Sequence, residues 1–255
     1  MKVRAIGTGA KFCRHPLVPA SFLITSGKDL TIVGAPWPVI PALERYGYSI
    51  EQVKLVTILS PQNDQIAGLV EIASLVSKKK KPILAAPAKL LETVKARLED
   101  ELGCFLSDKF DIKSVTRMHI KEEYYSEAIS FVPNYLDARI PSYGMKFENA
   151  KLFISGETQL NEDWLFKEMD CEVILHSCSK AGRSPTISEL QSLPGYLQQK
   201  MWIYGYDSEA KDIEQPFPML YLPPGSWIFD SDRRDKLINK ERFIRENAKK
   251  YTTTP

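Results

Sequence analysis

The segment from Thr57 to Leu69 constrains this chain more than any other stretch. An apolar, β-branched run is followed by a polar turn, and Asp64 then opens a run with the apolar spacing of a helix. Neutral imidazole is the preferred zinc ligand at neutral pH, but the turn offers Ser60, Gln62 and Gln65 instead of histidines. Only Asp64 is a good metal ligand. The segment therefore indicates the frame of an active site without the side chains for metal chemistry.

Composition excludes several classes of protein. The chain has 255 residues, of which 44% are hydrophobic, so it can bury a substantial core in one large domain or two small ones, and we expect one. A net charge of +2 and a pI near 8.2 give no strong field for nucleic acid or a membrane surface. No apolar run approaches the ~20 residues of a membrane span. The four cysteines show no CxxC spacing, which is typical of reduced thiols in a cytoplasmic protein: Cys13, Cys104, Cys171 and Cys178.

The order of predicted elements favours an α/β fold. Two buried strands at 55–59 and 82–86 alternate with helices at 64–77 and 87–102, and Gly103 closes the second helix. Short strands then dominate from residue 110 to residue 204. Two sheets flanked by helices, a four-layer αββα sandwich, accommodate this order. We expect a main domain at 1–210 and a C-terminal extension at 211–255, with a strand at 226–229 and a charged helix at 233–250.

Several short segments, taken in order, carry a resemblance to a known family. The chain resembles the metallo-β-lactamase fold superfamily, and within it the small phosphodiesterase branch related to tRNase Z and to cyclic-nucleotide-degrading enzymes of bacteria and their phages. The resemblance covers most of residues 1–210. The segments that carry it are Gly7-Thr8-Gly9, Phe22-Leu23-Ile24, Asp64-Gln65-Ile66-Ala67-Gly68-Leu69, Pro141-Ser142-Tyr143-Gly144-Met145-Lys146-Phe147, Ser155-Gly156-Glu157-Thr158-Gln159, Val173-Ile174-Leu175-His176-Ser177-Cys178 and Lys200-Met201-Trp202-Ile203-Tyr204-Gly205-Tyr206.

The resemblance implies a two-metal centre whose ligands this chain lacks. At the family's hairpin Asp stands Val33, and its His-x-His-x-Asp-His loop reads Ser60-Pro61-Gln62-Asn63-Asp64-Gln65. Its bridging Asp becomes Glu157 and its last His becomes Gly205, while a further His position aligns loosely near Val132. Every aligned histidine is absent, so we expect no bound metal and no other cofactor. A catalytic zinc needs about three good ligands, and two carboxylates with neutral oxygens hold zinc weakly.

Individual residues allow two interpretations each. Asp64 is either a surviving ligand or, as we favour, the N-cap of its helix. Glu157 is either a functional acid or a hydrogen-bond partner of Gln62 or Gln65 in a vacated metal pocket. His176 and Cys178 share a strand face and could bind a metal, but a packed strand end is the favoured reading.

Surface segments also carry alternatives. Arg183 and Tyr204 are candidate contacts for a phosphate-bearing ligand, although simple solvation at the surface is the favoured reading for Arg183. The run Lys78–Lys81 fits a solvated helix end better than an anion site. Trp37 with its neighbouring prolines, and the stretch Tyr221–Trp227, are either docking surfaces or rigid loops.

These observations lead to three functional hypotheses. The first is a catalytically inactive protein, a pseudoenzyme, retained as a structural or partner-binding subunit, with self-association implied by the resemblance. The charged C-terminal helix is a candidate docking element. The second is binding of a nucleotide or cyclic nucleotide without turnover, through Arg183 and the aromatic side chains. The third is residual metal-dependent phosphodiesterase activity through Asp64 and Glu157.

Overall fold

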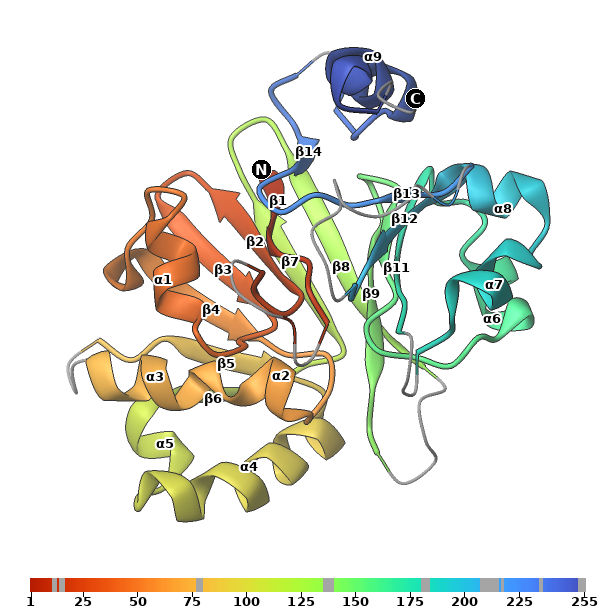
Figure 1. Cartoon of the computed structure of the whole chain (residues 1–255). Coiled ribbons are helices and arrows are strands. Elements are labelled where there is room, and N and C mark those ends of the chain that lie inside the picture. The colour runs from red at the N-terminus through yellow and green to blue at the C-terminus, as the bar shows by residue number, and fades with distance from the viewer. Residues whose placement is uncertain are drawn as a thin grey trace.

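A computed structural model describes most of the chain. It covers all residues except 11–12, 14–16, 77–79, 135–139, 180–183, 207–215, 217, 234–235 and 252–255, and the side chains of 246–251 are also left out. Two seven-stranded sheets lie face to face, and helices cover their outer faces (Figure 1). This arrangement confirms the predicted αββα sandwich. No helix in the described part of the chain is long and apolar enough to cross a membrane.

The first sheet has the order β14-β1-β2-β3-β4-β5-β6. Its first half is antiparallel and its second half, from β3 to β6, is parallel. The parallel half is built by strand–helix crossovers, so the loops that follow β4 and β5 lie at the same end of the sheet, beyond the carboxyl ends of the strands. The strands are β1 Lys2–Gly7, β2 Ser21–Ser26, β3 Asp29–Val33, β4 Val53–Thr57, β5 Ile83–Ala86, β6 Asp111–Ser114 and β14 Trp227–Asp230.

The second sheet repeats this design with the order β13-β12-β11-β10-β9-β8-β7. Strands β7 to β10 are antiparallel, and β10 to β13 are parallel. The loops after β10, β11 and β12 therefore lie together at one end of the sheet, beyond the carboxyl ends of these strands. The strands are β7 Arg117–Lys121, β8 Ser126–Pro133, β9 Tyr143–Phe147, β10 Leu152–Ile154, β11 Val173–Ser177, β12 Met201–Tyr204 and β13 Leu220–Tyr221.

Three apolar layers hold the sandwich together. One lies between the first sheet and its helices, one between the two sheets, and one between the second sheet and its helices. The alternation of side chains along each strand supplies both faces of each sheet. The helices are α1 Val39–Glu44, η1 Ile50–Gln52, α2 Asn63–Ile66, α3 Gly68–Leu75, α4 Ala88–Leu102, α5 Leu106–Lys109, α6 Glu162–Lys167, α7 Ile187–Gln191, α8 Gly195–Lys200 and α9 Lys240–Tyr251.

Two predicted helices differ from those observed. The single helix expected at 64–77 is divided into α2 and α3, because the Gly68 N–H donates to the Ala35 carbonyl at 2.8 Å instead of continuing the helical ladder. Gly68 permits this approach, since a Cβ there would lie 2.4 Å from the Pro36 carbonyl oxygen. The charged helix expected from residue 233 begins at Lys240, because residues 236–238 bond along β14.

The C-terminal segment is joined to both sheets. It supplies the edge strands β13 and β14, and the α9 region docks through Phe243, whose ring lies 5.2 Å from that of Trp202. Lys240 Nζ donates to the carbonyls of Gln198 at 3.0 Å and Pro218 at 2.6 Å. The division of the chain at residue 210 stays a prediction.

Candidate functional site

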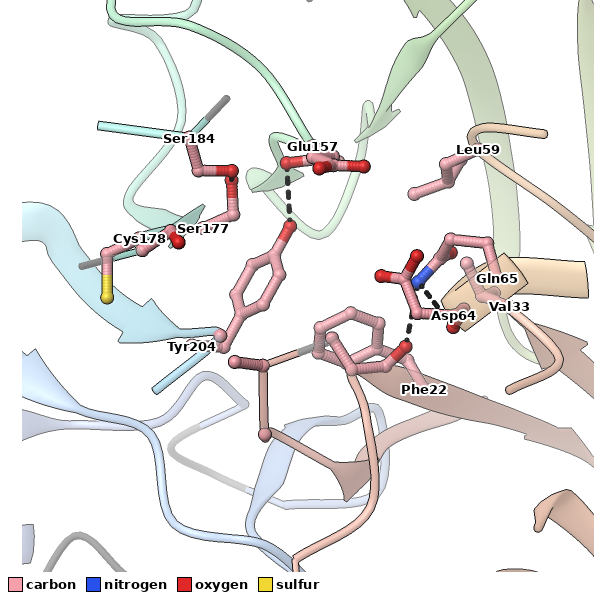
Figure 2. Close-up of a pocket in the computed structure, with 16 residues that line it drawn as sticks. Phe22, Val33, Leu59, Asp64, Gln65, Glu157, Ser177, Cys178, Ser184 and Tyr204 are labelled. Carbon is pink, nitrogen blue, oxygen red and sulfur yellow. Dashed lines mark hydrogen bonds between the residues drawn. The ribbon is translucent and has the colours of Figure 1, made fainter. Parts of the chain in front are cut away.

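A small cavity lies where the loops of the two sheets meet. Its volume is about 70 Å³, and the strands and helices around it carry most of the positions singled out from the sequence. In Figure 2, Asp64 and Gln65 stand on one side and Ser177 and Ser184 on the other, with Glu157 and Tyr204 between them. The tertiary structure thus gathers Asp64, Gln65, Glu157, Tyr204 and Gly205, which lie in three separate segments: α2, the loop after β10 and the end of β12.

Asp64 lies in the first turn of α2, and its side chain lines the cavity. The N-cap of α2 is Gln62, whose backbone is extended, and no side chain caps the helix. The expectation that Asp64 is the N-cap is therefore wrong by two residues. The physical reason is that the chain enters the helical conformation earlier than expected. The helix therefore begins at Asn63, and the Asp64 side chain points into the interior.

Gln65, where the resemblance implies a histidine, bonds to the protein backbone. Its Nε2 donates to the Ala20 carbonyl at 3.1 Å and more weakly to the Asp64 carbonyl at 3.4 Å. On the other side, its Oε1 is close to Gly34, where a Cβ would lie only 2.7 Å away. The amide thus ties α2 to the chain before β2, a structural role for a side chain in the cavity wall.

Glu157 is carried by a loop with little freedom. Its carbonyl oxygen accepts hydrogen bonds from Asn134 Nδ2 at 3.1 Å and Ser142 Oγ at 3.0 Å. The preceding Gly156 has φ +66°, and a Cβ there would lie 2.2 Å from the Tyr143 carbonyl oxygen. The loop therefore requires glycine at this point. The predicted hydrogen bond from Gln62 or Gln65 to the Glu157 carboxylate stays a prediction.

Aromatic and aliphatic side chains fill the space between the two carboxylates' loops. The ring of Tyr204 meets that of Phe22 edge to face, with centroids 5.5 Å apart. Its hydroxyl donates to the Gly156 carbonyl at 3.0 Å, and burial raises the pKa of Tyr204. Val33 and Leu59 complete the apolar wall. The Tyr204 hydroxyl, predicted as a ligand contact, is already used inside the protein.

Ser60 and Gln62 do not line the cavity. Ser60 is fully buried, and its Oγ lies 3.4 Å from the Gln62 amide nitrogen. The turn is held from outside by α4, where Arg97 Nη1 donates to the Pro61 carbonyl at 2.7 Å. Sequence patterns gave no signal for this contact, which joins residues 36 positions apart. Arg183, the other predicted ligand contact, lies outside the described residues.

Gly205 stands where the resemblance implies the last family histidine, and the local backbone favours glycine. Its φ is +86°, and a Cβ would lie 2.7 Å from the Cys178 carbonyl oxygen. Its N–H donates to the Thr8 carbonyl at 2.8 Å, which joins the end of β12 to the loop after β1. A histidine at this position would require a strained backbone and a displaced carbonyl.

His176 belongs to a different layer from the cavity. It is fully buried on β11, on the face that Ile174 shares with the outer helices, and its Nδ1 lies 2.8 Å from the Ser177 carbonyl oxygen. Burial lowers the pKa of His176 to about 4. Ser177 Oγ pairs with Ser184 Oγ at 3.0 Å, and a hydroxyl is no general base for a serine nucleophile.

A cluster that the sequence reading missed lies behind the second sheet. Glu168, Asp170 and Cys171 place their ligand atoms within 4.8 Å of one another. Lys146 Nζ already neutralises the group, at 2.9 Å from Glu168 and 2.8 Å from Asp170. Burial raises the pKa of Cys171 to about 12, so the thiol stays protonated. The ammonium therefore occupies the place that a cation would take.

Several of the remaining surface candidates have ordinary partners, whereas Trp37 is 66% exposed. Lys80 and Lys81 donate to the carbonyls of Glu51 at 2.8 Å and Ser107 at 2.9 Å, while Lys78 and Lys79 lie outside the described residues. Trp227 stacks on the Arg4 guanidinium at 4.8 Å.

The donor set around the cavity does not fit a two-zinc centre. The sequence has three histidines: His119 is exposed on β7, His176 is in another layer, and His15 is not described. Among the described residues, the cavity offers the carboxylates of Asp64 and Glu157 with an amide, hydroxyls and a phenol, while the sulfur of Cys178, which also lines it, points away from both carboxylates (Figure 2). Zinc sites depend on imidazole or thiolate with correct geometry, so this set cannot hold two zinc ions and activate water.

Comparison with solved structures identifies the class of fold. Human tRNase Z, short form, superposes with a TM-score of 0.64 at 12% identity, covering 89% of this chain and 98% of that one. A diphosphatase from the PhnP family superposes with a TM-score of 0.67 at 12% identity, covering 89% of this chain and 95% of that one. Unliganded yeast PDE1 superposes with a TM-score of 0.57 at 11% identity, covering 81% of this chain and 88% of that one. The protein therefore has the metallo-β-lactamase fold, as its sequence resemblance implied.

The sequence profile of one family is more specific. The profile described as Anti-Pycsar protein Apyc1 matches residues 1–218, and the chain belongs to this family. No curated protein sequence matches the chain significantly.

Proposed function

We propose that this protein is a non-catalytic member of its family that acts by binding a protein partner. The observation that carries the proposal is the cavity between the sheets, where Gln65 and Gly205 stand at histidine positions and are built into the backbone contacts of the fold. Without imidazole ligands the site cannot lower the pKa of a bound water, which is the central step of metal-dependent hydrolysis. The rest of the sandwich is intact, so its surfaces are available for recognition.

Metal content and hydrolysis together test this proposal. The full chain is purified without chelators, its zinc, manganese and magnesium are measured by mass spectrometry, and hydrolysis of cyclic nucleotides and of bis(p-nitrophenyl) phosphate is followed with each metal added. We expect far less than one tightly bound metal per chain and no rate above the uncatalysed background. The matched control carries Asp64→Asn with Glu157→Gln. Stoichiometric zinc that this double variant loses, together with turnover, would overturn the proposal.

Binding of a nucleotide without turnover is a second candidate, favoured by membership of a family described as anti-Pycsar. The cavity of about 70 Å³ argues against it, because pockets for ligands of that kind measure about 300–1,000 Å³. Tyr204 and Phe22 would have to move for a nucleotide to enter. Calorimetry with a panel of cyclic nucleotides separates the two: saturable binding that Tyr204→Trp abolishes supports the second candidate and weakens the first.

Residual phosphodiesterase activity is the third candidate, supported by the convergence of Asp64 and Glu157 on one cavity. Carboxylate oxygens suit magnesium or calcium rather than zinc, so such activity would depend on millimolar concentrations of a hard cation. The same assay with Asp64→Asn alone distinguishes it from a contaminating hydrolase, whose rate the substitution would not change.

A further inference from the structure

The four sheet edges differ in how far they are open. The edge beyond β13 is only two residues long, and β14 is covered by residues 236–238, with Ile238 donating to the Ile228 carbonyl at 2.8 Å. The edge strand β6 carries its own ion pair, between Lys113 and Asp111 at 3.6 Å. Strand β7 is different: it pairs only with β8, and no strand in the described part of the chain lies on its other side.

The pattern of hydrogen bonds between β7 and β8 shows which backbone groups of β7 face this open edge. The bonds from Phe131 N to Thr116 O and from Glu122 N to Tyr125 O are 2.9 Å and 2.7 Å long. In an antiparallel pair every second residue bonds to the neighbour, so the even-numbered residues of β7 face β8. The odd-numbered residues Arg117, His119 and Lys121 therefore direct their N–H and C=O groups outward.

Two of these residues, Arg117 and Lys121, carry a positive charge. Arg117, His119 and Lys121 are exposed, and their cross-strand partners in β8 are Ser130, Ala128 and Ser126, none of which is charged. Within the described residues, these three side chains have no hydrogen bond or ion pair. Unpaired backbone groups and positive side chains thus coincide along one strand edge.

The opposite face of β7 is apolar. Met118 and Ile120 are half-buried and pack against the core between the sheets. A strand added at this edge would therefore place alternate side chains in two environments, one beside cations and one beside aliphatic groups.

We propose that the β7 edge is a docking site for an extended, acidic segment of a protein partner, which adds to the second sheet as a further strand. Acidic residues at every second position would face Arg117, His119 and Lys121, and the intervening apolar residues would cover Met118 and Ile120. Backbone hydrogen bonds supply register and the alternation supplies specificity. The inference rests on the proposed partner-binding function and names its surface.

A second copy of the chain fits this edge poorly. Antiparallel pairing about a two-fold axis at His119 would set Arg117 opposite Lys121 of the other copy, and directly opposed like charges destabilise a sheet. Cations on an open edge also keep neutral strands of other proteins away. The charges that reject these strands attract an acidic one, so self-association of the protein would use another surface.

A titration followed by nuclear magnetic resonance tests the site. The probe is a short capped peptide of alternating glutamate and valine, added to the ¹⁵N-labelled full chain. We expect the amide signals of Arg117, His119 and Lys121 to shift most, and binding to weaken as salt is raised. Two control peptides use the unchanged protein. In one, every peptide nitrogen is methylated, which keeps the charge but removes the backbone donors; in the other, lysine replaces glutamate. Shifts of equal size with either control would overturn the proposal, as would an absence of shifts on β7.

Charge reversal provides the second readout. The variant Arg117→Glu with Lys121→Glu should bind the acidic peptide about tenfold more weakly, because two attractive pairs become repulsive. The control variant Lys89→Glu with Lys113→Glu changes net charge equally at other exposed positions and should change affinity less than about twofold. Equal weakening by both variants would show that net charge, and not the β7 edge, attracts the peptide.

The outcome is separable from that of the proposed function. If the protein carries zinc and hydrolyses phosphodiesters, the non-catalytic role fails whatever the peptide does. If the protein is inactive and the peptide does not bind at β7, only the inference about this edge fails.

Discussion

Replacing Gly205 by alanine tests whether the cavity could readmit a family ligand. At this position φ is +86°, and the added Cβ would lie 2.7 Å from the Cys178 carbonyl oxygen. The left-handed backbone costs an L residue about 1–2 kcal/mol, and pressing a methyl group into packed backbone costs about 1–3 kcal/mol. We therefore expect Gly205→Ala to lower the free energy of unfolding by about 3 kcal/mol. For a chain of this size that lowers Tm by about 6–12 °C.

Two other glycines separate these contributions. Gly103 has φ +60° with open space around its Cα, so Gly103→Ala measures the backbone term alone, about 1 kcal/mol. Gly195 has open space and lacks a positive φ, so Gly195→Ala should change stability by less than about 0.5 kcal/mol. Urea unfolding of the four proteins, followed by tryptophan fluorescence, gives the midpoints at constant m.

The comparison has a clear contrary result. If Gly205→Ala unfolds at the same urea concentration as Gly103→Ala, the Cys178 carbonyl moves aside without cost. A histidine at 205 would then be tolerated, and the fold would not exclude a side chain at this position. If the argument holds, Gly205→His is at least as destabilised as the alanine variant and binds no zinc.

Two further predictions concern buried charge. Burial lowers the pKa of His176 from 6.5 to about 4. As the pH falls, the unfolded chain therefore binds a proton at this histidine before the folded chain does. The contribution of neutral His176 to the free energy of unfolding is complete above pH 6.5 and is lost as the pH falls toward 4. The loss of stability should reach about 2 kcal/mol at pH 5, measured by urea unfolding, and His176→Asn should abolish it. If the stability of this variant depends on pH as steeply as that of the unchanged protein, His176 is not the group responsible. Lys146→Met leaves the nearly buried Glu168 without its ammonium partner and should cost about 2–4 kcal/mol, and adding Glu168→Gln should restore part of it. A melting experiment in which the second substitution restores nothing would show that Lys146 acts through packing alone.

Much of the fold could be predicted from local patterns. The strands expected at 82–86 and 226–229 form β5 and β14 within one residue of those limits, because buried strands are short apolar runs with strong β propensity. Gly103 ends α4 in the left-handed conformation, as its place after the last apolar helical residue indicates. The errors lie where distant contacts override local preference. The Ala35 carbonyl interrupts the helix at Gly68, and the outer edge of β14 takes residues 236–238 away from the predicted C-terminal helix.

The candidate site divides in the same way. The absence of histidines at the family positions is a property of residue identity, so it can be read directly from the sequence. That Asp64 and Glu157 line one cavity, while Ser60 and Gln62 do not, depends on the approach of two sheets whose strands are far apart in the chain. The outward direction of the backbone N–H and C=O groups of Arg117 and Lys121 likewise depends on the register between β7 and β8, which no local pattern specifies.

The sequence by itself therefore determined the αββα class and which side chains stand at the positions that resemble the family's metal ligands, because side-chain chemistry and short-range periodicity are encoded residue by residue. Only the tertiary structure decided how the residues at these positions are packed. Phe22 and Tyr204 pack edge to face in the cavity wall, the Gln65 amide bonds to backbone, and Gly205 has taken a conformation that excludes a side chain. Each of these outcomes arises from close packing between segments remote in sequence, where a contact's distance, not a residue's identity, sets its energy.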